Sequence, residues 1–248
     1  MIIATNWKAY VESVEKAKKI STLAKRLASR SSHEIIIAPP ATFLGLLAEK
    51  NHSKVSFMAQ DISSMTGGAH TGEITASMAR NSGASYVLVG HSERRTMGEN
   101  NELVTKKLQH ILAQGLTPVL CVGESERDED GSYLTFLREE ITDVFEPLTR
   151  KERLQVVIAY EPIWAIGKKA SESITVADLT EMVLYIRKIL TEFLSGRATN
   201  NVRVLYGGSV EPNNIRTLAE GSGIDGFLIG HASVELESFS ALVKELEV

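Results

Sequence analysis

The sequence predicts an α/β protein folded as a single (β/α)8 barrel over residues 1–248. Eight short apolar runs rich in β-branched residues recur along the chain, and amphipathic helical segments separate them. Because 248 residues divided by eight gives 31 residues per repeat, each repeat has room for a strand, a helix and their turns. Strands that are apolar along their whole length are typical of a parallel sheet covered on both faces.

The first strand is predicted over 2–5, where Ile-Ile-Ala-Thr opens the chain. The strands that follow it are predicted over 35–38, 55–59, 86–89, 118–122, 156–159, 202–205 and 227–229. Helical spacing of apolar residues predicts helices over 14–27, 103–112 and 176–194, and the tail 239–243 closes the alternation. A doubly wound open sheet would fit the same alternation, but no G-x-G-x-x-G turn follows the first strand. We therefore expect a closed barrel.

Composition excludes several classes of function. A hydrophobic content of 43% is enough for a full core, and a net charge of −4 does not favour a nucleic-acid partner. The lone cysteine, Cys121, excludes an intrachain disulfide and fits a reducing compartment, so we expect a cytoplasmic protein. No apolar run approaches the ~20 residues of a membrane helix, and the apolar start at 1–4 is interrupted by Asn6 and Lys8 before it could form a signal peptide. The six histidines show no metal-binding spacing, and we expect no metal or cofactor.

Candidate catalytic residues follow three of the predicted strands. In a (β/α)8 barrel the active site lies at the carboxyl ends of the strands. Lys8 follows the first strand, although a lone lysine there is also typical of the surface. His91 follows the fourth strand, before a predicted helix start that would favour a neutral imidazole; a structural core histidine is the alternative. Glu161 follows the sixth strand beside Trp164, as either a desolvated base or half of a structural ion pair.

Glycine-bearing turns follow the last two predicted strands. The first is Gly207-Gly208-Ser209 and the second is Gly230-His231. Glycine allows backbone amides to approach an anion, and the loops after strands seven and eight are the usual phosphate site of this fold. One such turn alone is typical of an ordinary tight turn, whereas the pair indicates a phosphate cradle.

Read in order, these segments resemble the motifs of the triosephosphate isomerase family. They are Asn6-Trp7-Lys8, 68–73 (Gly-Ala-His-Thr-Gly-Glu), 89–95 (Val-Gly-His-Ser-Glu-Arg-Arg), 121–124 (Cys-Val-Gly-Glu), 159–162 (Ala-Tyr-Glu-Pro) and 206–210 (Tyr-Gly-Gly-Ser-Val). The resemblance covers the whole chain. It implies interconversion of dihydroxyacetone phosphate and glyceraldehyde 3-phosphate through an enediolate, by a homodimer that needs neither metal nor coenzyme.

The resemblance also implies roles for individual residues. Glu161 would be the base, and a neutral His91 would polarise the carbonyl and shuttle hydroxyl protons. Lys8 and Asn6 would hold the substrate and stabilise oxyanion charge, with Glu93 behind them. The phosphate would bind at Gly167, Ser209, Gly230 and the backbone of His231, and the loop carrying Thr71 would contact the partner subunit near the active site.

The sequence departs from the family pattern at three places. After Gly167, where the family usually continues with Thr-Gly-Lys, the lid has Lys168-Lys169-Ala170 followed by Ser171-Glu172-Ser173. Either a Thr-Gly pair is missing and residues are added after it, or Lys168-Lys169 replaces the pair. His231 replaces the usual second glycine, which is compatible with phosphate binding if its φ angle is negative. The turn 95–99 is one residue shorter than usual. The altered lid leaves open a second interpretation, that of a barrel retained as a phosphosugar-binding or scaffold protein after weakened catalysis.

Overall fold

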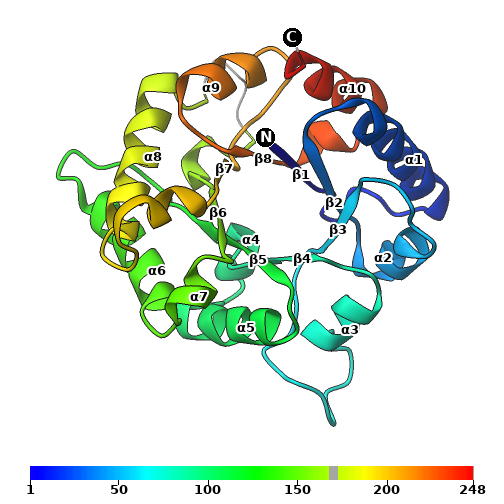
Figure 1. Ribbon diagram of the computed structural model, residues 1–248, viewed down its shortest axis with the longest axis horizontal. Coiled ribbons are helices and arrows are strands. Elements are labelled where there is room, and N and C mark those ends of the chain that lie inside the picture. The colour runs from blue at the N-terminus through cyan, green and yellow to red at the C-terminus, as the bar shows by residue number, and fades with distance from the viewer. Residues whose placement is uncertain (168–172, 248) are drawn as a thin grey trace.

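The computed structural model describes residues 1–167 and 173–247, and it confirms the closed barrel (Figure 1). Eight parallel strands pair in chain order, and the eighth returns to pair with the first. This closure rules out the doubly wound open sheet. The strands are β1 (Ile2–Asn6), β2 (Glu34–Ala38), β3 (Ser56–Ala59), β4 (Tyr86–Val89), β5 (Thr117–Val122), β6 (Val157–Tyr160), β7 (Val204–Tyr206) and β8 (Gly226–Ile229).

A ring of helices surrounds the barrel in Figure 1. They are α1 (Val14–Arg30), α2 (Ala41–Ala48), α3 (Ala76–Asn81), α4 (Ser92–Thr96), α5 (Asn101–Ala113), α6 (Ser132–Phe145), α7 (Arg150–Arg153), α8 (Val176–Leu190), α9 (Ile215–Gly221) and α10 (Leu236–Glu245). Short 3-10 turns occur at η1 (Ile163–Ala165), η3 (Gly196–Asn201) and η4 (His231–Ser233). None of the helices in the described ranges combines the length and the apolar character that a bilayer span requires.

The apolar strands serve two separate cores. Alternate strand residues point into the barrel and form one cluster, which includes Ala4, Ile36, Leu88, Cys121 and Leu228. The intervening residues point outward and pack against the helices in a second, larger cluster. Successive side chains of a strand point to opposite faces, and both faces are covered by a core. Each strand is therefore apolar along its whole length.

Helix starts are fixed by capping side chains. Ser13 accepts a hydrogen bond from the amide of Lys16 at the start of α1, and Thr175 accepts one from the amide of Asp178 at the start of α8. The predicted helix over 176–194 ends earlier than expected, at Leu190. Residues 191–193 form a turn instead. Leu194 is buried although it lies after this turn, so the apolar spacing in the sequence extends beyond the end of the helix.

Candidate active site

A cavity of about 310 Å³ opens at the carboxyl ends of the strands. Its walls come from the loops after five strands, most of them far apart in the sequence. The lining residues are Asn6, Lys8 and Tyr10 after β1, His91 after β4, Glu161, Ile166 and Gly167 after β6, and 207–211 and 230–232 after β7 and β8, with Leu228 beneath. The structure therefore brings together all the predicted site residues except Glu93 and Thr71 as lining residues of one cavity.

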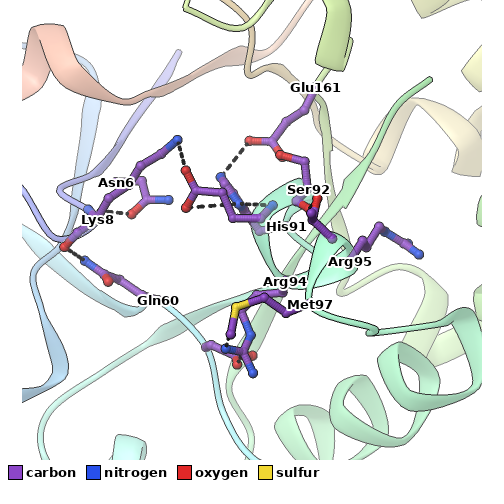
Figure 2. A network of polar contacts seen from close by, with 12 residues as sticks. Asn6, Lys8, Gln60, His91, Ser92, Arg94, Arg95, Met97 and Glu161 are labelled. Atoms are coloured by element: carbon purple, nitrogen blue, oxygen red, sulfur yellow. Dashed lines mark hydrogen bonds and ion pairs between the residues drawn. The ribbon is translucent and has the colours of Figure 1, made fainter. Parts of the chain in front are cut away.

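His91 and Glu161 face each other across this cavity (Figure 2). The distance from His91 Nε2 to Glu161 Oε1 is 3.3 Å, and both side chains are almost fully buried. The backbone amide of Glu93 donates to His91 Nδ1 at 3.2 Å, which assigns the lone pair to Nδ1 and the proton of a neutral ring to Nε2. The imidazole can therefore donate a hydrogen bond into the cavity.

The backbone around Glu161 fixes the direction of its carboxylate. Its amide donates to the carbonyl of Val122 at 2.8 Å. This hydrogen bond keeps the chain beside β5 immediately after β6 ends. A Cβ atom at Gly207 would lie 2.6 Å from Glu161 Cγ, so glycine at 207 makes room for the side chain. Oε2 has no hydrogen-bond partner among the described residues, and this oxygen is free to accept a proton.

Lys8 is held in an unusual backbone conformation. Its φ angle is 45°, in the left-handed region, which costs roughly 1–2 kcal/mol for a residue with a side chain. The side-chain oxygen of Asn6 accepts from the Lys8 amide at 3.0 Å, and Gln60 Nε2 donates to the Lys8 carbonyl at 3.0 Å. The ammonium then reaches Glu93 Oε1 at 2.8 Å. Lys8 lines the cavity, and Figure 2 shows its side chain beside that of Asn6.

Glu93 does not line the cavity, and its side chain is 59% exposed. Partial burial would raise its pKa, but the hydrogen bond and the charge of Lys8 outweigh that effect, so the pKa of Glu93 lies below its usual value. Glu93 is consequently ionised at neutral pH and partly neutralises Lys8.

The glycine-bearing turns form the other end of the cavity. Gly167 has a φ angle of 70°, a conformation that favours glycine. Ser209 Oγ donates to the carbonyl of Ala165 at 2.9 Å and so connects the loop after β7 to the first part of the lid. His231 is absent from the residues with positive φ, so the condition for a usable amide at this position is met. The altered lid residues 168–172 lie outside the described residues.

Thr71 lies on the exposed loop that projects from the barrel near α3 (Figure 1). It is not among the residues that line the cavity of its own chain. Residues 65–74 of this loop are all exposed, including Met65 and Ile74. The loop thus presents apolar side chains away from its own core.

Buried polar contacts connect the loops after β5 and β6. Tyr160 and Trp164 both donate to Glu124 Oε1 at 2.8 Å, and the Arg127 guanidinium lies 5.0 Å from the centre of the Trp164 ring. Burial, with the charge of Glu124 as the second cause, raises the pKa of Tyr160 well above its usual value, which keeps its hydroxyl a donor. The indole of Trp164 therefore finds its hydrogen-bond acceptor in Glu124.

A second buried group joins the loops after β4 and β5. Arg95 Nε donates to the carbonyl of Gly90 at 2.9 Å and lies 3.1 Å from Glu140 Oε1. Glu140 Oε2 accepts from the amide of Gly123 at 2.8 Å. Burial raises the pKa of Glu140 to about 7 even though Arg95 and the Gly123 amide act to lower it.

Several of these residues were not anticipated from the sequence. Gln60 and Tyr10 stand close after β3 and β1, so the strand-end rule could have found them. Gly207 was predicted only as part of the phosphate site. It also leaves room for the side chain of Glu161, which the sequence could not show because this role depends on the distance between two loops. Cys121 is buried inside the barrel, and burial raises its thiol pKa well above the usual value. Within the described residues no cluster of histidine, cysteine and acidic side chains is arranged for a metal.

The geometry defines an acid–base enzyme whose (β/α)8 barrel places a carboxylate, an imidazole and a lysine at the mouth of the barrel. The family model described as Triosephosphate isomerase matches residues 1–246. Relatives named triosephosphate isomerase include a Roseiflexus sp. (strain RS-1) protein, 37% identical over 250 residues that cover 100% of this chain and 98% of the relative. Others come from Endomicrobium trichonymphae, 39% identical over 246 residues, and Moorella thermoacetica (strain ATCC 39073 / JCM 9320), 38% identical over 245 residues; each alignment covers 98% of this chain and 97% of the relative. The chain belongs to the triosephosphate isomerase family and is an isomerase.

Proposed function

We propose that Glu161, His91, Lys8 and Asn6 are the groups with which this isomerase interconverts dihydroxyacetone phosphate and glyceraldehyde 3-phosphate. The observation that carries the assignment is the 3.3 Å approach of His91 Nε2 to Glu161 Oε1 inside the cavity that Lys8 also lines. A base, a neutral hydrogen-bond donor and a cation are then within reach of one small substrate. Nothing favours the alternative interpretation, in which the barrel is retained as a phosphosugar-binding or scaffold protein after weakened catalysis.

The proposed reaction moves one proton between neighbouring carbons. Glu161 removes a proton from C1 of dihydroxyacetone phosphate, the C1–C2 double bond forms, and the electron pair of the carbonyl moves to its oxygen. The enediolate oxygen is stabilised by the His91 Nε2–H group and by the Lys8 ammonium, which lies near it in a largely dehydrated cavity. His91 moves the hydroxyl proton from O1 to O2, and Glu161 returns its proton to C2, which leaves the aldehyde at C1.

The proposed phosphate cradle consists of Gly167, Ser209, Gly230 and the amide of His231. Closure of a lid over such a site, for which triosephosphate isomerase is itself a standard example, excludes water from the reacting carbons. The Ser209–Ala165 hydrogen bond supports a coupling between the phosphate end of the cavity and the lid. Exclusion of water would also keep the enediolate from eliminating phosphate.

The assignment of the base is tested with Glu161→Gln in purified protein. A positioned general base typically contributes ~10²–10⁴-fold to the rate. We expect kcat to fall by at least 100-fold in a coupled assay with glyceraldehyde 3-phosphate, with an unchanged circular dichroism spectrum. A loss of less than tenfold in well-folded protein would contradict the role of Glu161.

We further propose that residues 1–248 form one catalytic domain that works as a cytoplasmic homodimer. Support comes from the exposed loop 65–74 with Met65 and Ile74, which leaves apolar surface outside the barrel core. Docking of the loops around a twofold axis would cover this surface and bring Thr71 near the partner's active site. Light scattering at micromolar concentration should give about twice the 27.2 kDa chain mass. A fully active monomer would contradict the dimer.

A further inference from the structure

The imidazole of His231 stands at the phosphate end of the catalytic cavity. The residue is exposed, lines the cavity beside Gly230, and packs against Tyr10, another lining residue. The ring centroids of His231 and Tyr10 are 5.2 Å apart with an interplanar angle of 85°, an edge-to-face arrangement that restricts the position of the imidazole. The side chain is therefore held at the rim of the cavity and remains open to solvent.

The charges around this cavity are poorly matched to a dianion. Of the described residues that line it, Lys8 is the one with a permanent positive charge, and Glu161 and Glu211 carry carboxylates. Lys8 is also paired with Glu93 at 2.8 Å, which further reduces its field. A phosphate monoester carries a charge of about −1.5 to −2 at pH 7, so its binding requires additional positive charge or strong amide donors.

His231 is the lining group that can supply this charge. The other lining imidazole, His91, accepts an amide hydrogen bond at Nδ1, which fixes it in the neutral form that the proposed reaction needs. Lys8 Cε lies 3.8 Å from the position that a Cβ of Gly230 would occupy, so the permanent cation approaches the residue directly before His231. The remaining charged neighbour along the chain, Glu235, is paired with Lys16 at 3.1 Å.

We propose that the side chain of His231 is a further substrate-binding group, whose protonated imidazole contacts the substrate phosphate and makes its affinity depend on pH. The proposal rests on the function proposed above and deepens it. A protonated imidazole carries a positive charge and a neutral imidazole does not. The affinity of the cavity for a dianion should therefore fall as the pH rises.

Sulfate is the suitable probe, because the second ionisation of a phosphate ester near pH 6 would obscure the titration of the protein. Sulfate remains a dianion from pH 5.5 to pH 8.5. Its dissociation constant is measured by isothermal titration calorimetry at constant ionic strength for the wild-type protein, His231→Gln and His231→Lys. Competition with substrate in the coupled assay establishes that sulfate occupies the catalytic cavity.

We expect sulfate to bind His231→Gln about two- to fivefold more weakly than the wild type at pH 6, the range of an exposed ion pair, and equally well at pH 8.5. His231→Lys should bind tightly at both pH values. His52→Gln removes another exposed histidine and should keep the wild-type profile. The KM of the substrate should show the same ratio between wild type and His231→Gln.

The proposal would be overturned if the dissociation constant of sulfate changed with pH in the same way for the wild type and His231→Gln. Residue 231 would then contribute to anion binding only through its backbone amide. Calorimetry needs no turnover, so this result is separate from a failure of the proposed function, which would show as a wild-type protein without isomerase activity. Circular dichroism checks that each variant is folded.

Discussion

The buried carboxyl of Glu140 allows a quantitative test of the electrostatics behind the active site. Burial raises its pKa in the folded protein to about 7 from its ordinary value of 4.5. Between these values the folded state holds a proton that the unfolded state has lost, so folding becomes less favourable as pH rises. At about 1.4 kcal/mol per pH unit, this penalty reaches about 3 kcal/mol above pH 7.

Glu140→Gln removes this titration and retains an oxygen that can accept from the Gly123 amide. We expect the free energy of unfolding of the variant, relative to wild type, to rise by about 2.5 kcal/mol between pH 5 and pH 8. Urea unfolding of both proteins at the same chain concentration, followed by circular dichroism, gives this difference. Glu139→Gln makes the same chemical change at an exposed position of α6 and serves as the matched control.

Parallel stability curves for wild type and Glu140→Gln would refute the reasoning. The 3.1 Å contact with Arg95 would then outweigh burial, and Glu140 would be ionised throughout the range. A variant that is destabilised equally at every pH would lead to the same conclusion. Only a difference that grows with pH agrees with a carboxyl that is protonated in the folded protein near pH 6.

Three further predictions concern catalysis. Lys8→Met should lower kcat/KM by at least 100-fold with an unchanged circular dichroism spectrum, since a charge pair ~4 Å apart at an effective dielectric near 20 is worth up to about 4 kcal/mol. Gly207→Ala should lower kcat at least tenfold because its Cβ would lie 2.6 Å from Glu161 Cγ, whereas Gly45→Ala, with 3.8 Å to the nearest atom, should remain fully active. Trp164→Phe removes an indole donor at the start of the lid, so the ratio of methylglyoxal formation to isomerisation should increase; an unchanged ratio would show that this contact does not contribute to lid closure.

The sequence predicted the barrel correctly because its periodic signal is local. Each strand must be apolar on both faces, and each helix carries a spaced apolar face, so the repeat can be recognised without tertiary information. Strand ends shifted by one or two residues, as for 202–205, which became Val204–Tyr206. The prediction that the helix extends to residue 194 was wrong, because α8 ends at Leu190. Leu194 is buried in the core but follows the turn after the helix.

The positions of the site residues were also accessible from local information. Parallel strands in a barrel end at the same edge, so residues such as Lys8, His91 and Glu161 must converge wherever each follows its strand. Distances between side chains were not accessible, because they depend on how separate loops pack. The partner of Trp164 illustrates this limit: its indole donates to Glu124, 40 positions earlier in the chain, and not to the neighbouring Glu161.

The loop that carries His91 shows what fixes such distances. Gly90, directly before His91, has a φ angle of 71°, its amide donates to Glu99 Oε1 at 3.2 Å, and its carbonyl accepts from Arg95 at 2.9 Å. Glu99 in turn lies 2.6 Å from Lys107 Nζ, and both side chains are almost completely buried. Buried ion pairs contribute little net stability, yet loss of one partner leaves an unpaired charge that costs about 3–5 kcal/mol. The network therefore favours one backbone geometry at Gly90 strongly over its alternatives, and this geometry holds the imidazole 3.3 Å from the carboxylate of Glu161.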